Sequence, residues 1–195
     1  MNTPVIFDLQ SQDKPERIGN KAEKLASLMQ VRHIKVPKSW VIPWDAYHQY
    51  LNQPDSVMDE IEKNLQTFLD PKKSYAVRSS SNIEDGNFHS FAGLFKTFLN
   101  VRGFTEIRKA VIEVWAATQS EPVKKYLEKL ELSPDQILMS VIIQEMVHPM
   151  YSGVLFSRNP MTGTNEIVIE GVKGEGVALV PDGVTPERWI SRQGA

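Results

Sequence analysis

The stretch Ile137–Val147 is almost continuously apolar, and this run constrains the fold of the 195-residue chain more than any other feature. A strand of this composition has no polar side to present to water. We therefore expect it to lie in the middle of a sheet that is covered on both faces. The chain is long enough to build such a core in one sizeable domain or in two small lobes.

The other expected elements make a mixed pattern, with helices mainly first and strands mainly in the second half. Apolar residues at helical spacing predict helices near 20–29, 44–51, 55–69, 105–118 and 123–132. Strands are expected near 5–9, 36–43, 75–78, 94–101, 152–157, 166–170 and 187–191, with a glycine-rich turn at Gly171–Gly176. We therefore predict an α+β fold with a soft boundary between residues 102 and 133.

The stretch Tyr75–Asp85 has the composition of an anion site. A short apolar run ends in Arg78 and three serines. The guanidinium is a forked cation, and the hydroxyls and loop amides can donate to phosphate oxygens. The alternative is a strand that ends in a polar turn. Because another strand is expected at 94–101, the intervening loop is predicted to form a hairpin-like flap.

Two further stretches would complete a ligand site. Gly19-Asn20-Lys21 opens a helix, so the lysine can add its charge to the positive end of the helix dipole. The alternative is a solvated lysine in the first turn. At the end of the apolar run, the Gln144 amide and backbone groups can meet a planar heteroaromatic ring, with Met146 and Val147 as an apolar wall. The alternative here is a plain strand end in the core.

Composition argues against several classes of partner. The net charge is −2, from 22 basic and 24 acidic residues without a long block of one sign. This balance does not favour nucleic acid or an anionic membrane as a partner. No stretch approaches the roughly 20 apolar residues of a membrane span, and the N-terminus lacks the features of a signal peptide, so the cytoplasm is the expected compartment.

The residue types that hold metals or act as nucleophiles are sparse. The chain has no cysteine, which excludes disulfides and thiolate chemistry, and its four histidines show no metal-ligand spacing. The adjacent carboxylates Glu84 and Asp85 can either hold a magnesium ion or neutralise Arg78 and shape the loop. No metal site is predicted from these residues.

Taken together, six stretches resemble one family in their order along the chain. They are Gly19–Ala22, Val36–Pro43, Ala76–Ser80 with Glu84-Asp85, Ser90–Gly93 with Thr97–Val101, Gln144–Val147, and Ser152–Pro160. The set resembles the N-terminal ATP-binding domain of phosphoenolpyruvate synthase and pyruvate phosphate dikinase, which rifampicin phosphotransferase shares. The resemblance covers nearly the whole chain.

The resemblance implies an ATP-grasp-like fold in which the nucleotide lies between two lobes. Residues 1–101 would form the lobe with the phosphate-side strand and the flap, and residues 102–195 the lobe on the adenine side. Arg78 would be the catalytic residue. The residues that the resemblance assigns to the nucleotide are Lys21 and Arg78 at the phosphates, Gly93 and Thr97 in the flap, and Gln144, Met146 and Val147 at the adenine.

The chain departs from the family pattern in three places. Asn20 stands where the family usually has a second glycine, which is expected to stiffen or reshape that turn. Gly86–His89 replaces a run that usually contains Leu-Pro, which would place the flap differently. The family's magnesium-binding Glu and Gln lie further along than residue 195. The implied fold is therefore truncated at its C-terminal end, with Mg²⁺ ligands expected beyond it.

In the full enzymes, ATP phosphorylates a histidine on a swivelling domain, and another domain passes the phosphate to pyruvate. We therefore expect the ATP-binding domain of a phosphoenolpyruvate synthase-like phosphotransferase, with ATP and those two domains as its partners. Two alternatives stay open: the ATP domain of a rifampicin phosphotransferase-like enzyme, and a non-catalytic nucleotide-binding module. Because phosphoryl transfer depends on metal and cations, the chain alone is expected to bind nucleotide weakly and to have no autonomous dikinase activity.

Overall fold

In the computed structural model the chain has an α+β architecture, as the ATP-grasp-like resemblance implies, and it divides into two compact units. The structure describes residues 5–11, 17–83, 85–86, 89–90, 95–129, 131–133, 136–176 and 185–192. The first unit comprises Met1–Met146 and the second Val147–Ala195. No helix in the described ranges is long and apolar enough to cross a membrane.

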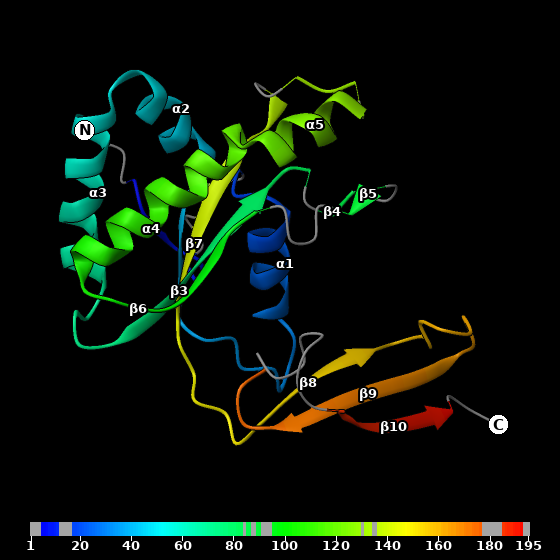
Figure 1. Ribbon diagram of the computed structural model, residues 1–195. Helices are drawn as coiled ribbons and strands as arrows, with labels where there is room; N and C mark the ends of the chain where they lie inside the picture. The colour runs from blue at the N-terminus through cyan, green and yellow to red at the C-terminus, as the bar shows by residue number, and fades with distance from the viewer. Residues whose placement is uncertain are drawn as a thin grey trace. The chain divides into compact units, whose positions relative to one another are not determined.

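The first unit is built on a five-stranded antiparallel sheet in the order β1-β2-β7-β3-β6. Its strands are β1 (Phe7–Asp8), β2 (Ser39–Ile42), β3 (Ser74–Ser81), β6 (Thr97–Arg102) and β7 (Met139–Glu145). β7 lies in the middle, between β2 and β3, and six of its seven residues are buried (Figure 1). The central strand predicted from the apolar run is confirmed.

Helices cover both faces of this sheet (Figure 1). They are α1 (Asn20–Leu28), α2 (Trp44–Asn52), α3 (Pro54–Phe68), α4 (Phe104–Ala116), the 3₁₀ turn η1 (Ala117–Gln119) and α5 (Glu121–Lys129). On one face, Val141 and Ile143 of β7 join the large core with apolar residues of α2 to α5. On the other face, Ile142 packs with Ala22 and Ala26 of α1. Alternation along β7 thus sends neighbouring side chains into two separate cores.

Two very short strands lie between β3 and β6, where the flap is predicted. β4 (Asp85–Gly86) and β5 (His89–Ser90) pair antiparallel, with Asp85 opposite Ser90. This pairing is the one expected of a hairpin. Gly93, which the sequence assigns to the flap, lies outside the described residues.

The compact units do not divide the chain where the sequence placed the boundary between its two lobes. α4 packs on α3 and on β3, and β7 pairs with strands from the first part of the chain. These contacts bring residues 103–146 into the first unit. The division into lobes at residues 101 and 102 stays a prediction about the nucleotide-binding architecture.

The second unit contains a three-stranded antiparallel sheet in the order β10-β9-β8. Its strands are β8 (Tyr151–Phe156), β9 (Glu166–Lys173) and β10 (Glu187–Arg192). β9 continues through Gly171, so the prediction that a glycine-rich turn begins there is wrong. Gly171 pairs with Gly153 on one side and Glu187 on the other. A Cβ on Gly171 would lie 3.1 Å from the Trp189 ring, so glycine at this position lets the indole lie against the strand.

The connection between β8 and β9 is organised around a nearly buried asparagine. The Asn159 side-chain oxygen accepts hydrogen bonds from the backbone N–H groups of Met161 and Thr162, at 3.0 and 3.3 Å. Its amide nitrogen donates to Oε2 of Glu166 at 2.9 Å, and the Thr164 hydroxyl donates to the same oxygen at 2.9 Å. These hydrogen bonds lower the pKa of Glu166 below its ordinary value of 4.5, and the one from Asn159 has the largest effect.

The lowered pKa of Glu166 predicts how acid acts on this unit. The folded state favours the carboxylate, so its contribution to stability is present above about pH 4.5 and is lost as the pH falls through the folded-state pKa. Thr164→Val removes one donor while keeping the side-chain shape, so we expect it to raise the pKa of Glu166. A ¹³C NMR titration of the Glu166 carboxyl measures this shift, with Thr67→Val on α3 as the control. An unchanged pKa in Thr164→Val would contradict the assignment.

Candidate functional site

Polar side chains gather on the face of the first-unit sheet that α1 covers. Arg78 of β3 lies opposite Thr97 of β6 on one side and opposite Ile142 of β7 on the other. Gln144 lies two residues beyond Ile142 on the same strand, opposite Ser39 of β2. Directly opposed residues share a face of a sheet, as do residues two apart on one strand. Arg78, Thr97 and Gln144 are therefore together on this face, although they come from three strands.

The start of α1 is held against β3 by a close approach of two backbone segments. Gly19 has φ 78° and ψ 159°, a conformation that is essentially restricted to glycine. A Cβ on Gly19 would lie 2.3 Å from the carbonyl oxygen of Ser80. The Ser80 hydroxyl donates to the Ile18 carbonyl at 2.9 Å and accepts from the N–H of Ala22 at 3.0 Å. This junction fixes the first turn of α1 on the strand.

The same junction changes the interpretation of the serines that follow Arg78. The sequence predicted a strand that ends at Arg78 and hydroxyls that can donate to phosphate. Instead, β3 continues to Ser81, and Ser79–Ser81 are all fully buried. The single hydroxyl proton of Ser80 is used by the Ile18 carbonyl, so this hydroxyl joins α1 to β3 and does not donate to a ligand.

Lys21 lies in the first turn of α1, directly after this junction. Its ammonium group donates to the backbone oxygen of Ser79 at 3.1 Å. Ser79 is the neighbour of Arg78 in the strand, so the two cations that the sequence assigned to phosphate lie at the same part of β3. The N-terminal end of α1 adds the positive end of a helix dipole there.

Arg78 and Gln144 contact one another through their side chains. Nη1 of Arg78 donates to Oε1 of Gln144 at 3.4 Å, which is longer than the usual range of about 2.7–3.2 Å. Nε2 of Gln144 donates to the Ser39 hydroxyl at 3.0 Å. Gln144 is only 9% exposed, so its amide is held within the protein more than a strand end predicts. Sequence reasoning missed Ser39, because a serine before a buried tryptophan carries no recognisable signal.

The end of β7 has most of its backbone donors in use. The N–H of Glu145 donates to the Lys38 carbonyl and that of Met146 to the Ser74 carbonyl, both at 2.9 Å. Val147 belongs to the second unit and is 55% exposed. The structure thus brings Lys21, Arg78, Thr97, Gln144 and Met146 into one unit, while Val147 lies in the other and Gly93 is outside the described residues.

Two further polar contacts brace this region. The Asn20 amide donates to the backbone oxygen of Asn82 at 3.1 Å, so the residue that departs from the family pattern ties the start of α1 to the end of β3. At the other end of the strands, Lys73 donates to the Glu145 carboxylate at 2.8 Å. This hydrogen bond, together with the negative charge of Glu145, raises the pKa of Lys73.

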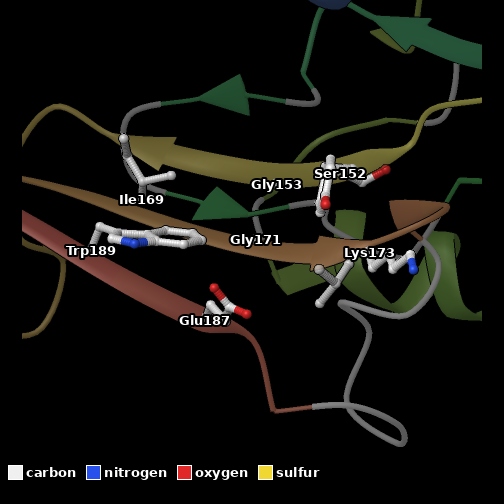
Figure 2. A pocket seen from close by; sticks show the side chains of 9 residues that line it. Ser152, Gly153, Ile169, Gly171, Lys173, Glu187 and Trp189 are labelled. Atoms are coloured by element: carbon white, nitrogen blue, oxygen red, sulfur yellow. The ribbon is translucent and has the colours of Figure 1, made fainter.

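The second unit has a hollow of about 500 Å³ on one face of its sheet. Figure 2 shows the Trp189 indole of β10 beside Gly171 of β9. Ile169 lies on the same strand as Gly171, and the Glu187 carboxylate lies at the edge of the hollow. Gly153 and Gly171 are among the residues that line the hollow, and most of the lining is apolar. None of the residues that the sequence assigned to a nucleotide lines this hollow.

Comparison with known proteins found a match to one family of domains. The family described as the pyruvate phosphate dikinase AMP/ATP-binding domain matches residues 52–194. The chain is 40% identical to the phosphoenolpyruvate synthase of Aeropyrum pernix over 116 residues, which cover 59% of this chain and 14% of that enzyme.

Two other relatives align with almost the whole chain. It is 32% identical to the prodigiosin synthesizing transferase PigC of Serratia marcescens, and 28% identical to the rifampicin phosphotransferase of Streptomyces sviceus. Each alignment covers 97% of this chain but only 24% and 26% of the respective relative. The chain therefore spans about a quarter or less of the length of the curated relatives that it matches.

The junction between α1 and β3 predicts a large difference between two glycine substitutions. Gly103 has nearly the same backbone conformation as Gly19, with φ 77° and ψ 152°, but nothing lies within 4 Å of a Cβ built there. Gly103→Ala should therefore lower the free energy of unfolding by about 1–3 kcal/mol, from backbone strain alone. Gly19→Ala should cost clearly more, because its methyl group also overlaps the Ser80 carbonyl. Urea denaturation of the two variants measures the difference, and equal losses would contradict the close approach.

Proposed function

The chain belongs to the family of the pyruvate phosphate dikinase AMP/ATP-binding domain, and from this premise we propose that Lys21, Arg78, Thr97, Gln144, Met146 and Val147 bind ATP. The parent activity that we propose is transfer of phosphate from ATP to a carrier histidine on another domain, and from there to pyruvate. Gly93 keeps the role that the resemblance implies, as part of the flap over the phosphates. The adenine-side role of Val147 rests on the resemblance alone.

One observation supports this proposal most directly: two cations from distant parts of the sequence meet at one part of β3. Lys21 reaches the backbone of Ser79, the residue next to Arg78. A triphosphate carries several negative charges. The side chains that bind it best are arginine, whose guanidinium makes forked contacts, and lysine, whose ammonium acts as a point charge. Thr97 lies opposite Arg78 on the neighbouring strand and offers a hydroxyl on the same face. This arrangement supports binding of the phosphates at the α1 side of the sheet.

The proposed adenine side follows from the position of Gln144. Its amide is the polar group next to Arg78 on this face, and the strand that carries it ends at Glu145. Because the N–H of Met146 already donates to Ser74, we propose that Met146 contributes apolar contact and not a backbone donor. A base that lies here would place its phosphates toward Arg78 and Lys21.

Mg²⁺ has no identified ligands in the described part of the chain. Among these residues, no group of three His, Asp or Glu side chains lies close enough together to hold a metal ion. We therefore assign no step of the reaction to a metal bound by this chain. The prediction that the magnesium ligands lie beyond residue 195 is unchanged.

A second candidate function is suggested by the relative from Streptomyces sviceus that is named rifampicin phosphotransferase. Its alignment covers nearly the whole of this chain, as does that of the transferase from Serratia marcescens. In both candidate functions this domain would bind ATP in the same way. A phosphorylation assay of the parent protein with pyruvate and with rifampicin separates the two, because only the acceptor differs.

The ATP site can be tested directly with the 195-residue chain. Isothermal titration with Mg²⁺-ATP should give binding that Arg78→Ala weakens by about 10- to 100-fold, the size of a lost charge-assisted hydrogen-bond pair. Arg78→Lys should recover only part of the affinity, because an ammonium cannot make forked contacts.

A matched control removes a positive charge from the opposite side of the sheet. Arg108 of α4 pairs with Glu62 of α3 at 3.3 Å, in the helical layer that covers the other face. Arg108→Ala should leave the affinity within about twofold. If Arg78→Ala binds ATP as tightly as the unmodified chain, Arg78 is not part of the site. If the unmodified chain itself does not bind ATP, the proposed function is wrong for this chain.

A further inference from the structure

Ser39 is the third residue in a directed series of hydrogen bonds that begins at Arg78 and ends at the Pro37 carbonyl. Nη1 of Arg78 donates to Oε1 of Gln144, and Nε2 of Gln144 donates to Oγ of Ser39. The Ser39 hydroxyl in turn donates to the Pro37 carbonyl at 2.7 Å. Ser39 is fully buried and Gln144 is 9% exposed, so water competes little for these contacts.

The chemistry of these groups allows only one orientation of the Gln144 amide. A serine hydroxyl has one proton, and the Ser39 hydroxyl donates it in a hydrogen bond to the Pro37 carbonyl. Toward Gln144, therefore, Ser39 can only accept, and the amide must turn its NH₂ group to Ser39. Its carbonyl oxygen then faces Arg78, whose guanidinium can only donate.

The reversed amide would be unfavourable at both ends. It would place the NH₂ group against the guanidinium, donor against donor. The Ser39 hydroxyl would also have to break its hydrogen bond to the Pro37 carbonyl in order to donate to the amide oxygen. The energetic penalty of leaving a buried polar group without a partner is larger than the gain from an ordinary hydrogen bond.

The acceptor at the end of this series is itself rigidly placed. The backbone carbonyl of Lys38, the residue after Pro37, accepts the N–H of Glu145 at 2.9 Å. Ser39 begins β2 and lies directly opposite Gln144 in the antiparallel register. The segment that holds the Ser39 proton is thus tied to the same strand that carries Gln144.

We propose that Ser39 is a positioning residue that fixes the orientation of the Gln144 amide and, through it, the direction of the Arg78 guanidinium for nucleotide binding. This inference rests on the proposed ATP site. The long contact of 3.4 Å between Arg78 and Gln144 fits such a role, because it directs the guanidinium without holding it as tightly as a phosphate would.

The first test is a set of serine variants titrated with Mg²⁺-ATP. Ser39→Ala should raise the Kd by about three- to tenfold, the effect of one buried neutral hydrogen bond. Ser39→Thr keeps the hydroxyl and should stay within about twofold. Ser140→Ala is the matched control: Ser140 is a fully buried serine of β7 whose hydroxyl has no hydrogen-bond partner among the described residues, so this variant should also stay within about twofold.

A double-mutant cycle separates positioning from a general loss of packing. Gln144→Met keeps the length of the side chain but removes the amide. If Ser39 acts through Gln144, adding Ser39→Ala to Gln144→Met should not change the Kd further. An equal loss in both backgrounds, or an equal loss in Ser140→Ala, would overturn the proposal.

The second test does not depend on ATP. In the nucleotide-free chain, the side-chain NH₂ protons of Gln144 should exchange slowly with solvent in NMR spectra, and Ser39→Ala should accelerate this exchange while Ser39→Thr should not. Unchanged exchange in Ser39→Ala would overturn the proposal even if ATP binds. Accelerated exchange in a chain that does not bind ATP would support the orientation of the amide by Ser39 and would reject the proposed function.

Discussion

Burial of β7 on both faces is the constraint on which the rest of the first unit depends. A strand with apolar side chains in both directions needs a neighbouring strand at each edge and a covering layer on each side. β2 and β3 are the neighbouring strands of β7. Helices α2 to α5 form the layer on one face, and α1 forms the layer on the other. The polar site exists at the place where this apolar strand ends, because Gln144 is the first residue of β7 that turns a polar side chain toward α1 and finds partners there.

The layer made by α1 also explains why Lys21 and Arg78, the residues proposed to bind phosphate, lie at the same part of β3. α1 can lie close to β3 because Gly19 has no side chain to collide with Ser80, and the Ser80 hydroxyl then holds two backbone groups of the helix start. Lys21 follows in the next residues and reaches the strand beside Arg78. The proposed site therefore depends on this junction. The family match is consistent with that role, because cationic side chains are what a domain needs to bind the phosphates of ATP.

Several features followed from the sequence because they depend on local pattern. The central strand, the helices that cover it, a hairpin-like loop between β3 and β6 and the family itself were all predicted from periodicity, turn residues and motif order. The failures have a common cause in contacts between distant segments. The serines after Arg78 have the composition of a polar turn, yet all three are buried. Ser80 lies under α1, whereas Ser79 and Ser81 lie opposite Val141 and Met139 on the face of the large core. Gly171 has the composition of a turn, yet it continues β9 because Gly153 and Glu187 pair with it on both sides.

The sequence by itself determined the fold class, the family and the identity of the candidate residues, since apolar periodicity and motif order are written along the chain. Only the tertiary structure decided which polar groups hold the elements of the fold together and which lie beside the proposed site. Ser80 and Ser39 are the same residue type, and both are fully buried. One joins α1 to β3 and the other supports the amide beside Arg78, because their hydroxyl protons go to different backbone carbonyls. Ser80 donates to a carbonyl 62 residues away, and Ser39 accepts from an amide 105 residues away, and no local pattern encodes either partner.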